Sequence, residues 1–304
     1  MPTQTTSIST GEKVSNSPSP AASAAYALCN WADGGAQGAP PASWTIIWQP
    51  NNPKVPGYAV ILQNADISNN YAVVVQGTKD SQDWIWDKDC QYQAAFPYVA
   101  NTNISQGAQE ALAGALGNTG ALGITFEIAL QRISLSTNTF LFTGHSLGAF
   151  LAAILSAWFT SQLTGESTIT ALASQITAIT FAPPAMGDSN LASFLNNQAN
   201  YTAYFNTNDA IPYVWAVTGE FSIPNMYNLF PSPGPSPMPP NLASQIENDV
   251  TEMQNNGVSY QQTNGVTFTV PPVEERIGTP DTKWMSELAY EHNEAYRDYF
   301  LGGE

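Results

Sequence analysis

Residues 139–149, TFLFTGHSLGA, form an apolar run that breaks into the pattern Gly-x-Ser-x-Gly and then continues as a long apolar segment. This pattern is typical of a strand that turns sharply into a helix and exposes the serine at the edge of a sheet. Gly144 and Gly148 leave no Cβ where the strand and helix backbones would crowd together. We therefore expect Ser146 to project its hydroxyl from a tight, strained turn.

The segment after this turn favours a nucleophilic role for Ser146. Residues 149–158 are rich in Ala, Leu and Phe and lack Pro and Gly, which predicts a helix. The helix N-terminus would direct partial positive charge and the Leu147 N–H toward the place where an oxyanion forms. The alternative is that Ser146 only occupies a turn before a buried helix. The agreement between the motif, its flanks and the partner residues described below favours the nucleophile.

The composition indicates one large folded region with an acidic surface. Hydrophobic residues make up 43% of the 304 positions, which is ample for a core. Residues 1–24 are rich in Ser, Thr and Pro and predict a flexible arm, so we expect a single domain over 25–304. With 8 basic and 24 acidic residues, the net charge of −16 opposes binding of nucleic acid or anionic lipid. Adsorption to a lipid–water interface would depend on apolar contacts.

The cysteines and histidines indicate no metal site. Two separated histidines and two distant cysteines offer no ligand cluster, so we expect neither a metal nor another cofactor. A bond between Cys29 and Cys90 would close a loop of about 60 residues and contribute about 4 kcal/mol through chain entropy. Free thiols are the alternative, and the sequence leaves both open.

The sequence contains no convincing targeting or membrane-spanning segment. Only Lys13 precedes a short Ala-rich stretch at 21–28, so we expect no signal peptide. No apolar run is long enough to cross a bilayer. The acidic surface slightly favours an extracellular role, and the oligomeric state is not indicated.

Alternating strand and helix patterns predict the α/β class. Helical patterns occupy 105–133, as one or two helices, and the region near 189–197. β-Branched and aromatic runs between turn residues predict strands at 44–49, 58–63, 71–76, 176–181 and 201–206. This alternation predicts a largely parallel, helix-covered sheet, in which functional groups collect at the carboxyl ends of the strands.

The third of these strands ends in a candidate anion-binding corner. Gly77 permits an unusual turn, and Thr78 can offer both its N–H and its hydroxyl to an oxyanion. An ordinary strand-ending turn is the alternative. We favour the oxyanion role because the serine turn needs a second hydrogen-bond donor.

An amphipathic segment follows at 81–98, with Trp84, Ile85 and Trp86 among acidic residues. Such a segment beside an oxyanion corner could close over the site as a lid that contacts substrate. The alternative is a satellite core beneath a long loop. Both remain open at this point.

A carboxylate and an imidazole complete the candidate site. Asp209 follows the strand at 201–206 and comes after the serine in sequence, as expected for the acid of a triad. Asp188 competes, but its place at the start of a predicted helix favours capping. His145 adjoins Ser146, and neighbouring side chains diverge, so His292 is the remaining base.

Five motifs along the chain together carry a resemblance to a known family. They are VQGT with DW at 75–78 and 83–84, GHSLGA at 144–149, FAPPAMG at 181–187, NDAIP at 208–212 and HNEAY at 292–296. In this order they resemble the class 3 lipases, the family of the fungal triacylglycerol lipases. That family usually has an arginine before the glycine of the oxyanion strand, whereas this chain has Gln76.

The resemblance implies an α/β-hydrolase fold with a central, mostly parallel sheet covered by helices and a lid near 81–98. It also implies a catalytic triad of Ser146, Asp209 and His292, with Thr78 and Leu147 forming the oxyanion hole. The implied activity is hydrolysis of carboxylic esters, foremost triacylglycerols, through an acyl-enzyme. The rivals are a phospholipase, a feruloyl-type or short-chain esterase, and a catalytically silent lipid-binding protein. The presence of all three triad residue types argues against silence.

Overall fold

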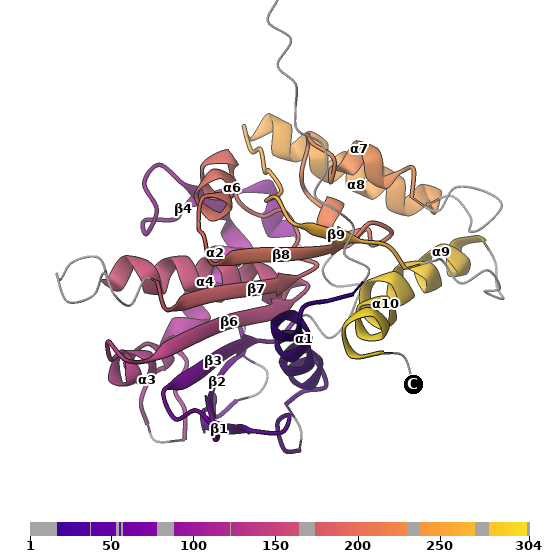
Figure 1. Ribbon diagram of the computed structural model, residues 1–304. Helices are drawn as coiled ribbons and strands as arrows, with labels where there is room; N and C mark the ends of the chain where they lie inside the picture. Colours follow the sequence, from indigo (N-terminus) through magenta and orange to yellow (C-terminus); the bar gives the residue numbers. More distant parts are fainter. Residues whose placement is uncertain are drawn as a thin grey trace, which may run out of the picture.

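The main sheet of the protein is mixed, with a parallel part that carries the candidate site. The computed structural model describes residues 17–36, 38–52, 55, 57–77, 88–121, 123–163, 174–229, 238–270 and 280–302. Within these residues seven strands form one sheet in the order β1-β2-β3-β6-β7-β8-β9 (Figure 1). β1 (Trp44–Trp48), β2 (Ala59–Asn64) and β3 (Asn70–Val75) pair antiparallel. From β3 onward the pairing is parallel, through β6 (Thr139–His145), β7 (Ile176–Phe181), β8 (Tyr201–Asn206) and β9 (Val266–Phe268).

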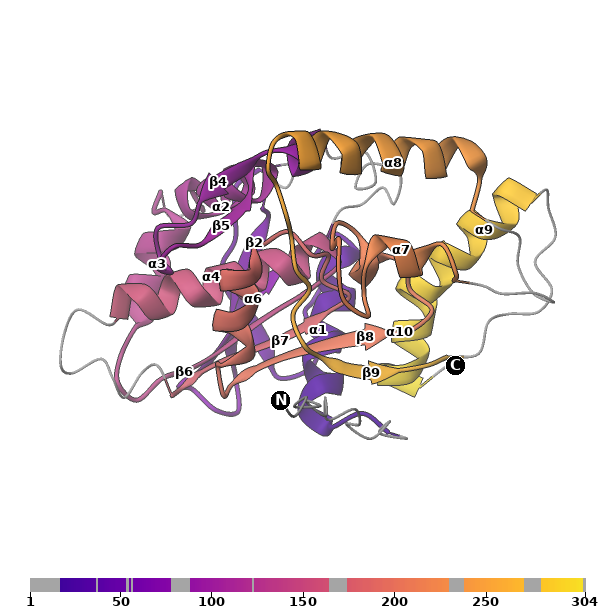
Figure 2. The same cartoon turned by 90° about the horizontal axis from the view of Figure 1, so that it is seen from above.

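Helices cover both faces of this sheet, with α1 (Pro20–Asp33) and α4 (Leu147–Leu163) on opposite sides of β6. The remaining helices are α2 (Gln106–Gly117), α3 (Phe126–Ile133), α6 (Ser189–Asn196), α7 (Ile223–Met226), α8 (Pro240–Asn255), α9 (Pro280–Ala289) and α10 (Ala295–Arg297). The small strands β4 (Gln93–Ala95) and β5 (Asn103–Ser105) pair antiparallel. Figure 2 shows α9 and α10 beyond the ends of the parallel strands.

The alternation of side chains along β6 explains this layering. Phe140 and Phe142 point toward α4, where both rings lie against Phe159 with centroids 5.0 and 5.6 Å away. Leu141 and Thr143 point to the other face, where the Thr143 hydroxyl lies 3.1 Å from the Cys29 thiol of α1. Because side chains alternate along a strand, one sequence run supplies two apolar layers.

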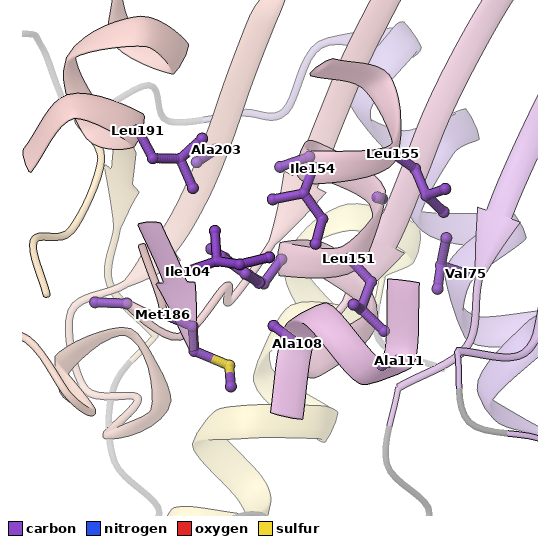
Figure 3. Close-up of a cluster of buried hydrophobic side chains, with 14 of the residues drawn as sticks. Val75, Ile104, Ala108, Ala111, Leu151, Ile154, Leu155, Met186, Leu191 and Ala203 are labelled. Carbon is purple, nitrogen blue, oxygen red and sulfur yellow. The ribbon is translucent and has the colours of Figure 1, made fainter. Parts of the chain in front are cut away.

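The core on the α4 side is close-packed and built from small and branched side chains. In Figure 3, Ala108 and Ala111 of α2 lie beside Leu151 of α4. Small side chains on α2 let the two helices approach closely, which favours dense packing. This layer holds the helix that begins at the serine turn firmly against the sheet.

The strand and helix predictions are largely confirmed. Each strand predicted from sequence is present with ends within two residues, and the 105–133 region forms two helices, α2 and α3. The predicted α/β class and mostly parallel sheet are confirmed. The sequence patterns did not reveal α8 or β9. Both cysteines are buried and reduced, so no disulfide bond joins Cys29 to Cys90. None of the helices in the described ranges combines the length and apolar character needed to cross a membrane.

The N-terminal boundary differs from the prediction. Helix α1 begins at Pro20, inside the segment expected to be a flexible arm, and Ser19 caps it by accepting a hydrogen bond from the Ala22 N–H. Ala22 of α1 is fully buried in a cluster that includes Tyr296 and Phe300 of the C-terminal segment. Proline at the first helical position and an alanine-rich face favour this helix. Residues 1–16 lie outside the described residues.

Candidate active site

Ser146 lies in a strained turn between β6 and α4. Its φ of 60° is in the left-handed region that residues with a Cβ avoid. A Cβ on Gly144 would collide with the backbone of Gly148, and one on Gly148 would collide with the backbone of Val75. Both glycines are therefore required by close backbone contact, as the sequence predicted. The strained turn is secured because the Ser146 N–H donates to the Phe181 carbonyl of β7 at 2.9 Å.

Asp209 follows β8 and is fully buried. Its Oδ1 accepts the backbone N–H of Ile211 at 2.9 Å, which orients the carboxylate. Its Oδ2 lies 2.9 Å from Nδ1 of His292. The structure thus brings together an aspartate and a histidine that are 83 positions apart in the chain.

His292 lies in a π-helical turn, Tyr290–Glu294, between α9 and α10. Such turns are rare and occur frequently at functional sites. The preceding residue, Glu291, is fixed by Asn206, whose amide donates to the Glu291 carboxylate at 2.6 Å and to its carbonyl at 3.0 Å. The turn is therefore tied to the end of β8, close to Asp209.

The buried surroundings shift the pKa values of the imidazole and the carboxylate. Burial lowers the pKa of His292 well below its ordinary value of 6.5, and the nearby His145 lowers it further while Asp33 opposes this. Burial raises the pKa of Asp209, against the effects of the Ile211 N–H, His145 and the Tyr296 hydroxyl. The two groups touch and titrate as a pair. A neutral imidazole at neutral pH can accept a proton.

His145 turns away from Ser146, as the sequence predicted, and contacts the neighbouring histidine. Its Nε2 lies 2.7 Å from the backbone oxygen of His292. The two imidazole rings lie 4.5 Å apart between centroids. Because His145 is adjacent to Ser146 in the chain, this contact joins the serine turn to the turn that carries His292.

The candidate oxyanion corner is described up to Gly77. A Cβ on Gly77 would lie 2.8 Å from the His145 carbonyl oxygen and 3.4 Å from the Ser146 Cβ, so the end of β3 closely approaches the serine turn. Leu147 is the first residue of α4, which puts its N–H at the helix N-terminus beside Ser146. Thr78 lies outside the described residues, and its role stays a prediction.

The predicted lid falls partly outside the described residues, which exclude Trp84, Ile85 and Trp86. The remainder of the segment, residues 88–98, is described as a 3₁₀ turn at Lys88–Gln91 followed by β4. Here Cys90 and Phe96 are buried in the main core. These two side chains therefore belong to the main core and not to a separate satellite cluster beneath a loop.

Asp188 caps a helix. Its Oδ1 accepts the N–H groups of Asn190 and Leu191 at the start of α6, each at 3.0 Å. Its Oδ2 accepts the Asn103 N–H at 2.8 Å. These bonds occupy both carboxylate oxygens and explain why this aspartate follows a strand without facing a histidine.

Several residues beside the site were not found from the sequence. Tyr26 and Asp33 of α1 contact the serine and histidine turns, and Glu291 and Tyr296 pack against Asp209 and its strand. These contacts join segments that are 44 to 267 positions apart. The one local signal was Asp33 at the C-terminal end of α1, because a negative charge there opposes the helix dipole and calls for a long-range partner.

Known proteins show the same architecture. Residues 72–218 match the family model described as lipase (class 3). The chain is similar to the solved structure of M37 lipase, with a TM-score of 0.68 and 19% identity over 85% of this chain and 79% of that one. It is also similar to the Rhizomucor miehei lipase in its propeptide complex, with a TM-score of 0.50 and 17% identity over 65% of this chain and 62% of that one. A search of curated proteins gives no match.

The family match covers the oxyanion strand, the serine turn and Asp209, and the structural likeness extends the shared fold to most of the chain. The α/β-hydrolase fold expected from the five motifs is confirmed. The stretch 72–218 therefore matches the class 3 lipases, the family that the five motifs resemble.

Proposed function

We propose that the protein hydrolyses acylglycerol esters through a triad of Ser146, His292 and Asp209 and an acyl-enzyme intermediate. The observation that carries the proposal is the 2.9 Å contact between His292 Nδ1 and Asp209 Oδ2, both buried, beside a strained Ser146. A nucleophile, a base and a residue that orients the base are the parts that acyl transfer requires.

The proposed chemistry begins with attack of Ser146 Oγ on the ester carbonyl carbon, while His292 Nε2 takes the hydroxyl proton. Asp209 holds the proton on Nδ1, so that Nε2 is free to accept, and stabilises the imidazolium that forms. The C–O bond to the leaving alcohol then breaks as His292 donates its proton to that oxygen. Water attacks the acyl-enzyme by the same route in reverse.

Charge develops on the substrate oxygen in each tetrahedral intermediate. We assign its stabilisation to the Leu147 N–H at the start of α4 and to Thr78, which follows Gly77 at the end of β3. The close approach of Gly77 to the Ser146 Cβ supports this assignment. The positive end of the α4 dipole acts in the same direction.

The surface charge favours a neutral lipid as substrate. A net charge of −16 opposes approach to anionic phospholipid surfaces, whereas a triacylglycerol droplet carries no such charge. Phospholipids, feruloyl esters and short-chain esters are the rival substrates within the same chemistry. A lipid-binding protein without catalysis is the rival outside it.

The test is a substrate panel with a matched variant. Triolein emulsion, phosphatidylcholine, a feruloyl ester and p-nitrophenyl butyrate are compared for the native chain and for Ser146→Ala. We expect the emulsion to be the best substrate and the variant to lose roughly 10⁴- to 10⁶-fold in kcat on every ester. Native-like turnover in Ser146→Ala would refute the nucleophile, and a native chain inactive on all four esters would support the lipid-binding protein.

A further inference from the structure

Helix α1 touches the segments that carry Thr78, Ser146 and His292. Asp33, the last residue of the helix, accepts the Gly77 N–H on Oδ1 at 2.8 Å, and its Oδ2 lies 3.2 Å from Nδ1 of His145. Two turns earlier in the same helix, the Tyr26 hydroxyl donates to the Asn293 carbonyl at 3.2 Å. Gly77, His145 and Asn293 are the immediate neighbours of Thr78, Ser146 and His292.

Each ring nitrogen of His145 faces an acceptor on another segment. Its Nε2 faces the His292 carbonyl oxygen at 2.7 Å, and a carbonyl can only accept. Its Nδ1 faces the Asp33 carboxylate, which also only accepts. His145 is therefore held between two acceptors, the Asp33 carboxylate and the backbone oxygen of His292.

A second contact brings the same helix end to the oxyanion strand. The Gln76 side chain donates to the Ala32 carbonyl at 2.5 Å. Gln76 stands where the class 3 lipases usually have an arginine, and here its amide binds the last turn of α1. An aspartate at the end of a helix opposes the helix dipole, so the placement of Asp33 is unfavourable locally and is explained by its long-range contacts.

We propose that Asp33 is a positioning residue that holds Gly77, His145 and, through His145, the turn of His292 in register. The inference rests on the proposed function and deepens it, because it assigns the alignment of nucleophile, base and oxyanion corner to one carboxylate in the N-terminal helix. Asp33 lies outside the stretch that matches the family model. It touches no reacting atom and acts through its two partners.

The variants separate its two contacts. Asp33→Asn keeps an oxygen for the Gly77 N–H but removes the charge that faces His145, whereas Asp33→Ala removes both. Small displacements of catalytic groups cost up to about 10²-fold. We expect kcat on p-nitrophenyl butyrate to fall about ten-fold in Asp33→Asn and further in Asp33→Ala, with KM unchanged. Asn30→Ala, at an exposed position of the same helix, is the matched control and should keep native kcat.

Three readouts distinguish positioning from loss of fold. Active-site titration with a fluorophosphonate gives the active fraction, so kcat is expressed per active site. Asp33→Asn combined with His145→Gln should be no slower than His145→Gln alone, because both changes break the same chain of contacts. Native kcat per active site in Asp33→Asn, or multiplicative losses in the double variant, would overturn the proposal.

A measurement that does not need activity keeps this proposal separate from the proposed function. The sequence has two histidines, so ring N–H signals in a ¹H–¹⁵N spectrum can be assigned with His145→Gln. We expect an Nδ1–H signal from His145 in the native chain and loss of that signal in Asp33→Asn. Absence of this signal in the native chain, or an unchanged signal in the variant, would contradict the contact even if the protein hydrolysed no ester.

Discussion

The serine turn and the histidine turn are built in different ways. The serine turn is a local structure, in which β6, two glycines and α4 fix Ser146 within a few residues. The histidine turn is a π-helical segment held by groups from far away in the chain. These are the Asn206 amide, the Tyr26 hydroxyl and the His145 ring, which lie 85, 267 and 147 positions from their partners.

The two halves of the site are therefore encoded in different parts of the sequence. The nucleophile's geometry follows from a short sequence pattern, so it can be read from the chain alone. The base obtains its position from tertiary contacts, so substitutions remote in sequence should affect it. Substitutions in the two turns therefore test whether the base depends on remote contacts more than the nucleophile does.

The largest effect is expected at the contact that aligns the base. Asp209→Asn replaces the acceptor of the His292 Nδ1–H by an amide that cannot enforce the same tautomer, and kcat should fall about 10⁴-fold. Asp188→Asn is the matched control, because that carboxylate caps α6 and contacts no histidine. It should lower the melting temperature and leave kcat unchanged. Similar losses of kcat in both variants would mean that Asp209 has no special role.

The next effect is expected at the oxyanion corner. Thr78→Val removes a hydroxyl donor and keeps the shape, so turnover should fall roughly 10²- to 10³-fold with little change in stability. Thr78→Ser, which retains the hydroxyl, is the control and should remain close to the native rate. Steady-state kinetics on a soluble ester measure kcat for both variants. Native turnover in Thr78→Val would leave the backbone N–H groups as the oxyanion donors.

A smaller effect is expected in the pH dependence of ester hydrolysis. The imidazole of His292 must be neutral to accept a proton, and burial holds its pKa well below 6.5. Activity should therefore persist at acidic pH and be lost only as pH falls through this lowered pKa, so the acid limb of kcat/KM should have its midpoint below 6.5. Initial rates across pH 4–9 measure this limb. A midpoint above 6.5 would show that the charged imidazole is favoured, against the burial seen here.

The smallest effect concerns stability. Burial raises the pKa of Glu291 from 4.5 to about 8, so the folded protein keeps a proton that the unfolded chain releases. The resulting stability is fully present below 4.5 and is lost as pH rises through 8. Glu291→Gln should flatten the decline of the melting temperature over this range.

The control for that titration is Glu110→Gln, which changes an exposed carboxylate on α2. Its melting temperatures should follow those of the native chain at every pH. If Glu291→Gln follows them as well, the buried carboxyl is not the titrating group. The claim that buried long-range contacts hold the histidine turn would then lose the support of this titration.

The features that could be predicted from the sequence are those built from local contacts, as in the serine turn. The strands at 176–181 and 201–206, the turn at Ser146 and the capping role of Asp188 could be predicted because each depends on residues close in the chain. The candidate base was found by elimination between two histidines. Its π-helical setting could not be predicted, because the contacts that hold it cross the whole fold.

The missed features have a common physical cause. Helix α1 was taken in part for an arm because its alanine-rich sequence carries little apolar periodicity, although Ala22 and Ala25 are fully buried. Asp33 has no local motif, and its meaning appears only beside Gly77 and His145. Short strands such as β9 (Val266–Phe268) depend on their neighbours more than on their own residues.

The most direct test of the central claim is covalent labelling of the native protein with a fluorophosphonate, followed by peptide mass spectrometry. A serine activated by His292 and Asp209 should form one adduct, located on Ser146, and Asp209→Asn should label far more slowly. An adduct on another serine, or equal labelling rates in the native chain and Asp209→Asn, would contradict the account.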